Sequence, residues 1–153
     1  MAQMQQGLAA RQATGNMVSR AAYLALLAEA DGRIGQTEAG LCRLAEALIM
    51  MDQMGARCEE PELYRIKGEL LRQQAIPDES QAEACFQQAL AVARRQQAKS
   101  LELRAAMSLS RLWQRQSKRA EARQLLGDIY GWFTEGFDTA DLQEAWALLE
   151  ALS

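Results

Sequence analysis

Arginine side chains on three stretches of this 153-residue chain are the groups best suited to do chemistry. A guanidinium group keeps its positive charge at any ordinary pH, and its planar fork of donors matches a carboxylate. A set of such side chains predicts a groove that grips an acidic protein segment; the alternative is that they only cover solvated helix surface. Together with two neighbours of other types, the residues concerned are Arg33, Arg65, Glu69, Arg72, Arg104, Met107, Arg111 and Arg115.

Histidine, the commonest general base at neutral pH, is missing from the sequence. Neither a Ser–His–Asp nor a Cys–His arrangement can therefore form, and the commonest metal ligand is absent. No GxxxxGK[ST] loop is present to cradle a phosphate. Acidic pairs such as Glu59-Glu60 and Asp78-Glu79 stand at predicted helix starts, where carboxylates complement the helix dipole. We therefore expect no catalysis, no cofactor and no metal site.

Charge and cysteine content narrow the partners and the compartment. Residues 61–120 carry 11 basic and 6 acidic side chains, whereas residues 121–153 carry 1 basic and 7 acidic ones. This asymmetry is too mild to predict nucleic-acid binding. No stretch approaches the roughly 20 apolar residues of a membrane span, and the N-terminus lacks the pattern of a signal peptide. Cys42, Cys58 and Cys85 form no CxxC motif, so we expect a reducing, cytoplasmic location.

Apolar residues recur at helical spacing along the whole chain, and β-branched residues are scarce, so the prediction is all-α. A turn is expected over residues 32–35. Pro61 suits the first turn of a helix, and Asp138 is expected to cap the last one. The predicted helices span residues 2–13, 17–31, 37–55, 61–74, 80–97, 101–115, 119–132 and a final segment from 138 onward.

A unit of about forty residues recurs three times. Each copy has a small residue, a second small residue twelve or fourteen positions later, and a bulky apolar residue four positions after that. Small residues let two helices approach closely, and the bulky one fills the groove between them. Periods in this range indicate a helical solenoid, a class that mostly binds other proteins. The three sets are Ala28, Gly40 and Leu44; Gly68, Ala82 and Phe86; and Ser110, Ala122 and Leu126.

At these positions the chain resembles a tetratricopeptide (TPR) repeat, whose second helix carries an A-x3-F pattern. Ala82-x3-Phe86-x2-Ala89 matches well, whereas Asp31 stands where an aromatic residue is usual. The resemblance implies one all-α domain, 1–153: a right-handed antiparallel helical solenoid of about three TPR-like hairpins plus a leading and a trailing helix. The implied units are the leading helix 1–15, the hairpins 16–55, 57–97 and 99–133, and a capping helix 138–153.

Three stretches, 63–71, 82–113 and 131–145, resemble the C-terminal repeat region of large bacterial signalling proteins. In those proteins a class III adenylate/guanylate cyclase domain, or another output module, precedes a STAND-type ATPase and then TPR-like repeats. The resemblance implies a sensing or scaffolding array, with the catalytic motifs in other domains. The chain also begins on what looks like the second helix of a hairpin, so we expect a fragment of such a protein or a stand-alone remnant of one.

In a TPR-like array the first helix of each hairpin lines the concave face, and this places the arginines there, together with Ala25, Glu29 and Gln114. The resulting prediction is a non-catalytic protein-interaction module for a protein or peptide partner, and the arginines favour an acidic one. One alternative is self-association as a homodimer through apolar ends of the solenoid. Another is a small-molecule sensor with a site between helices. The residues predicted at the ends are Met4, Leu8, Trp146 and Leu149.

The aromatic residues allow two interpretations. As a group they are typical of a binding hot spot. Alternatively, Trp113 belongs to the core, and the loop with Trp132, Phe133 and Phe137 seats the last helix against the third hairpin. Trp146 lies off the apolar stripe of that last helix, so we expect it to be partly exposed.

Overall fold

A computed structural model describes residues 3, 17–55 and 57–153, and this part of the chain is all-α, with seven helices and no strand. The predicted leading helix, including Met4 and Leu8, lies outside the described residues except for residue 3. None of the helices described is both long and apolar enough to cross a membrane. The helices are α2 (Met17–Arg33), α3 (Thr37–Met54), α4 (Glu60–Gln73), α5 (Glu79–Arg95), α6 (Lys99–Arg115), α7 (Arg119–Tyr130) and α8 (Ala140–Leu152).

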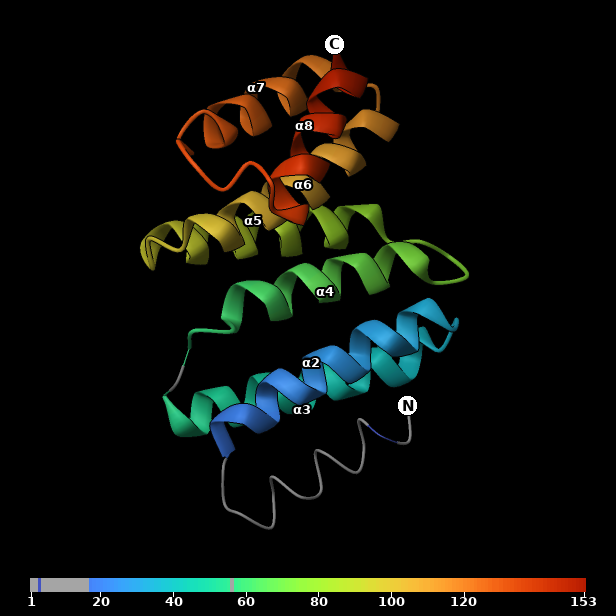
Figure 1. Ribbon diagram of the computed structural model, residues 1–153. Coiled ribbons are helices and arrows are strands. Elements are labelled where there is room, and N and C mark those ends of the chain that lie inside the picture. The colour runs from blue at the N-terminus through green and yellow to red at the C-terminus, as the bar shows by residue number, and fades with distance from the viewer. Residues whose placement is uncertain (1–2, 4–16, 56) are drawn as a thin grey trace.

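The helices stack in the order of the chain, as Figure 1 shows. The most extensive contacts join α2 to α3, α4 to α5, and α6 to α7, while α3–α4, α5–α6 and α7–α8 contacts link these pairs. In addition α4 contacts both α2 and α6, and α6 contacts α8. The helices α2, α4, α6 and α8 thus form one row, which we call the even row.

The small residues of the forty-residue unit lie where two helices of a pair come closest. A Cβ atom on Gly40 would lie 2.9 Å from the carbonyl oxygen of Ala28. In the next pair, Phe86 is fully buried, and its ring would lie 2.5 Å from a Cβ on Gly68. In the third pair, the Ser110 hydroxyl donates a 3.3 Å hydrogen bond to the carbonyl of Ala122. The repeat therefore marks a helix–helix contact in all three pairs.

Two buried carboxylates tie neighbouring helices together. Asp31, near the end of α2, is 1 % exposed and accepts a 2.7 Å bond from Arg43 of α3. Glu102 of α6 is 3 % exposed and accepts bonds from Arg94 of α5 (3.0 Å) and Lys99 (2.9 Å). Burial alone would raise the pKa of Glu102, but these two cationic donors outweigh it, so the pKa lies below its ordinary value.

Helix boundaries were predicted well in the middle of the chain and less well at its turns. Pro61 lies in the first turn of α4, as predicted. The predicted turn at 32–35 begins too early, because α2 continues through Arg33 and the chain reverses at Gly35, whose φ is +81°. The prediction that Asp138 caps α8 is wrong. That helix begins at Ala140 after Thr139, whose hydroxyl donates a 2.7 Å hydrogen bond to the Gly136 carbonyl.

Candidate functional site

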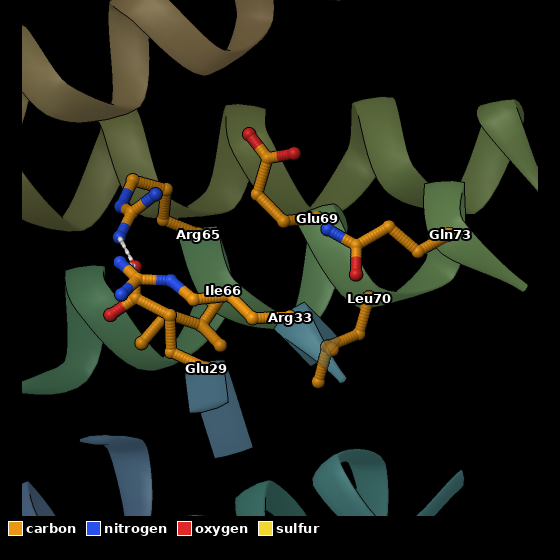
Figure 2. A pocket seen from close by; sticks show the side chains of 7 residues that line it. All are labelled: Glu29, Arg33, Arg65, Ile66, Glu69, Leu70 and Gln73. Carbon is orange, nitrogen blue, oxygen red and sulfur yellow. Dashed lines mark hydrogen bonds and ion pairs between the residues drawn. The ribbon is translucent and has the colours of Figure 1, made fainter. Parts of the chain in front are cut away.

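The even row carries two adjoining cavities, and together they form the candidate binding surface. The larger has a volume of about 280 Å³ and is lined from all four helices of the row. The smaller, about 170 Å³, lies over α2 and α4 and is shown in Figure 2. Glu29, Arg33 and Arg65 line both cavities. The remaining lining residues are Arg104, Met107, Ser108, Arg111, Asp141 and Glu144 in the larger cavity, and Ile66, Glu69, Leu70 and Gln73 in the smaller.

Most of the residues predicted for the partner-binding face lie at these cavities, and two do not. Glu69 lines the smaller cavity, and the larger one contains Met107 and four of the predicted arginines. Arg72 lines neither, and its guanidinium bonds to Glu69 on the same helix at 3.0 Å. Arg115, at the end of α6, approaches Glu79 of α5 to 3.8 Å and also lies outside both cavities.

The arginines of this surface are engaged by carboxylates of the same chain. Arg65 donates to Glu62 at 2.9 and 3.0 Å, and its guanidinium lies 4.0 Å from Glu29. Burial alone would lower the pKa of Arg65. The bond to Glu62 and the nearby carboxylates outweigh that effect, so the pKa is raised and the charge is secure.

These pairs continue across the whole even row. Arg104 donates to Glu62 of α4 at 3.1 Å and to Asp141 of α8 at 3.0 Å. An unbroken sequence of ion pairs therefore runs from α2 to α8, through Glu29, Arg65, Glu62, Arg104 and Asp141, and we call it the charge chain.

A parallel link joins α6 to α8, where Arg111 bonds to Glu144. The four arginines at the larger cavity thus face four carboxylates: Glu29, Asp141 and Glu144 in its lining, and Glu62 bonded beside them. The surface is mixed in charge rather than simply basic.

Three further residues, Glu62, Asp141 and Glu144, belong to this surface, although none of them was predicted there. Glu62 precedes Arg65 by three residues, which is the spacing of a helical ion pair. The contact between these two residues could therefore have been predicted from the sequence. Asp141 and Glu144 reach their arginines only because α8 packs on α6, and no local pattern reports that contact.

The pairs differ in how easily they open. Arg33 is 77 % exposed, and among the described residues it forms one ion pair, at 3.4 Å, with Glu29. The side chain of Arg104 is 42 % exposed, although its guanidinium bonds to two carboxylates. Exposed ion pairs of this kind are worth about 0–1 kcal/mol each. Arg33 and Arg104 are the two most exposed of the four arginines at the larger cavity, so an incoming carboxylate reaches them most readily.

The lining of the larger cavity includes a buried hydroxyl group that forms no hydrogen bond with the described residues. The Ser108 hydroxyl lines this cavity, is 1 % exposed, and has no hydrogen-bond partner among the residues described. A buried polar group without a partner costs about 1–3 kcal/mol. A ligand group that bonds to it would recover part of that cost. Within the described residues, no group of three or more Cys, Asp or Glu side chains is arranged to hold a metal ion.

Aromatic side chains gather at the far end of the stack, between α7 and α8. Tyr130 lies 5.8 Å, centroid to centroid, from both Phe137 and Trp146. Trp146 is 51 % exposed, as expected. Phe133 packs against the core, as predicted for a loop that seats the last helix, whereas Trp132 is 58 % exposed.

Trp113, which one of the two interpretations placed in the core, is partly buried. Its ring packs against the core, while its indole N–H donates a 2.9 Å bond to Glu83 of α5. The polar edge of the indole therefore stays at the surface, where it links α6 to α5.

No protein-family model matches the chain, and no curated protein matches it either. The function is therefore inferred from the chain's own geometry.

Proposed function

We propose that the chain is a non-catalytic protein-binding module and that the even row is its binding surface. The proposed architecture is a right-handed antiparallel solenoid of TPR-like hairpins, closed at one end by α8. Two features support it: the row of contacts α2–α4–α6–α8, and the small-residue contact that recurs in each helix pair.

The observation that carries this proposal is the larger cavity, because four helices from different parts of the chain contribute to it. Both cavities of the row are smaller than the roughly 300–1,000 Å³ typical of small-molecule sites. They are of a size to receive individual side chains of an extended or helical segment. A peptide laid along the row would place successive side chains in the two adjoining hollows.

The proposed binding chemistry is an exchange of carboxylates. An acidic side chain of the partner replaces Glu29 on Arg33, or shares Arg104 with Asp141, so that one charged hydrogen bond is traded for another. The Ser108 hydroxyl supplies a further donor at the cavity floor. The row is held in place by packing and by the charge chain before the partner arrives, so little ordering has to accompany binding.

The test is a fluorescence-anisotropy titration with a labelled peptide of alternating glutamate and leucine. The Arg33→Ala/Arg104→Ala variant is expected to bind about tenfold more weakly, since each net hydrogen bond is worth about 0.5–1.5 kcal/mol. The matched control is Arg95→Ala, which removes an exposed arginine from α5, outside the even row. Circular dichroism should be the same for all three proteins. Equal affinity of the double variant and the control would refute the even row as the site.

We further propose that this module serves as the sensing or regulatory repeat region of a larger bacterial signalling protein, or as a stand-alone remnant of one. The sequence stretches described above support this role. A cytoplasmic location is part of the proposal, and it is supported by the three cysteines, all of which are free thiols.

Self-association is the second candidate, and the exposed indole of Trp146 favours it. Aromatic residues anchor interfaces, and an isologous dimer would pair this surface with its own copy. Sedimentation velocity at increasing protein concentration tests the idea. A monomer at every concentration excludes it, and a dimer that Trp146→Ala dissociates supports it.

A further inference from the structure

We propose that the aromatic cluster of Tyr130, Phe137 and Trp146 is a second binding site, which takes a lysine or arginine side chain from a basic segment of a partner protein. This site lies at the α7–α8 end of the molecule, and none of its residues lines the cavities of the even row. It is therefore independent of the binding surface proposed for the even row.

The three aromatic rings line one cavity. A cavity of about 350 Å³ is lined by the three aromatic residues together with Leu142 and Gln143. Tyr130 is the central ring, and its plane is tilted by 48° from Phe137 and by 38° from Trp146. Phe137 and Trp146 are 45 % and 51 % exposed, so an entering side chain meets ring surface from two sides.

Aromatic faces attract cations, tryptophan most strongly, when the charge lies within about 6 Å of the ring centroid. The chain already uses this interaction nearby, because the Lys99 ammonium lies 5.5 Å from the centroid of Trp132. No cation of the described residues occupies the corresponding place over Tyr130, Phe137 or Trp146. Lys99 thus already occupies one face of the Trp132 ring, whereas the Trp146 ring is available to a cation of a partner.

Charge complementarity identifies the occupant as basic. Residues 121–153 carry seven carboxylates and one guanidinium, that of Arg123. Asp141 and Glu144 are neutralised by arginines of α6. Among the rest, Glu135 and Asp138 flank Phe137 in sequence, and Glu150 lies one helical turn beyond Trp146 on α8. No ion pair within the described chain engages these three.

One basic group does lie close to this end. Arg123 lines a neighbouring hollow of about 240 Å³ together with Trp146 and Glu150. Because three carboxylates that form no ion pair with the described residues share this end of the molecule with one guanidinium, its net charge is negative. A cation that enters the hollow is therefore favoured by the ring faces and by the negative charge of this end together.

The experiment follows the indole N–H resonances of the three tryptophans by two-dimensional ¹⁵N NMR during titration with the peptide Gly-Arg-Gly-Arg-Gly-Arg. The Trp146 resonance is expected to shift saturably, while that of Trp113, bonded to Glu83, stays in place. The same peptide with citrulline in place of arginine keeps the shape and loses the charge, and it should cause no saturable shift.

Two variants and one control complete the test. Trp146→Ala should weaken binding about five- to thirtyfold, which corresponds to the loss of a partly desolvated cation–π contact. Glu135→Gln/Asp138→Asn, at two exposed loop positions, should weaken it about two- to fivefold at low salt and less at high salt. Trp132→Ala removes a similarly exposed indole whose face is already used by Lys99, and it should leave the affinity unchanged.

Three results would overturn the proposal: no saturable shift with the arginine peptide, an equal shift with the citrulline peptide, or equal losses in the Trp132 and Trp146 variants. A dimer that Trp146→Ala dissociates, with no peptide response in the monomer, would also overturn it, because a second copy would then be the occupant.

Discussion

Replacement of Gly68 by alanine is expected to destabilise the protein, whereas the same change at Gly127 is expected to stabilise it. Both glycines lie inside helices, α4 and α7, where alanine is favoured over glycine by about 0.8–1 kcal/mol. The two positions differ in the space that a methyl group would find, so the pair separates packing from helix propensity.

At Gly68 the added Cβ would lie 2.5, 2.8 and 3.0 Å from three atoms of the Phe86 ring. That ring is rigid and 0 % exposed, so it cannot swing away into solvent. Overpacking of this kind costs about 1–3 kcal/mol. After the gain in helix propensity, a net loss of about 1 kcal/mol remains, which lowers Tm by about 2–4 °C for a chain of this length.

At Gly127 the nearest side-chain atom, Leu149 Cδ2, lies 4.0 Å from the added Cβ, which is an ordinary contact. The gain in helix propensity is then unopposed, and Tm should rise by about 2–4 °C. Thermal and urea denaturation followed by circular dichroism measures both variants against the parent protein.

A Phe86→Leu background provides the internal check. Leucine lacks the ring atoms that meet the new methyl group, so Gly68→Ala should cost less in this background. We expect a coupling energy of at least about 0.5 kcal/mol in the double-mutant cycle. A rise in Tm for Gly68→Ala as large as that for Gly127→Ala, or zero coupling to Phe86, would refute the close approach of α4 and α5.

Three further measurements test the buried polar groups. Glu102→Gln should destabilise the protein at neutral pH. Because the folded pKa of Glu102 lies below the ordinary 4.5, its contribution is complete above that pH and is lost as the pH falls through the folded value, so the two urea curves should converge in acid. Arg43→Ala should lower the free energy of unfolding, measured in urea, by about 1–3 kcal/mol. In an Asp31→Ala background the same change should cost much less, because the buried carboxylate is then absent. Burial raises the pKa of the Cys85 thiol, so its alkylation by iodoacetamide in the folded protein, followed by mass spectrometry, should lag behind that of the two exposed cysteines.

The helices were predictable because each carries its own periodic apolar stripe. The contacts inside each pair were also predictable, because small and bulky residues recur at a fixed spacing. Gly68 and Phe86 are the clearest case, since a repeat found in the sequence alone marks the point where two helices touch. The solenoid arrangement itself remains a proposal.

The electrostatic character of the candidate surface was not predictable to the same degree. Arginines could be assigned to one face, but their partners lie far away in the chain: Arg104 bonds to groups 42 and 37 residues distant. Asp31 shows the same limit. It looked like a weak match to an aromatic position, yet it is buried because Arg43 of the next helix neutralises it.

The order in which the helices pack has a consequence for how the chain folds. Among α2 to α8, every contact joins helices that are adjacent in the chain or separated by a single helix. Contacts of such short sequence separation need little loop closure, which favours folding within milliseconds or faster. A chain built this way can open from either end while the rest stays folded, so hydrogen exchange should be slowest in the middle helices, α4 to α6, and fastest toward the two ends.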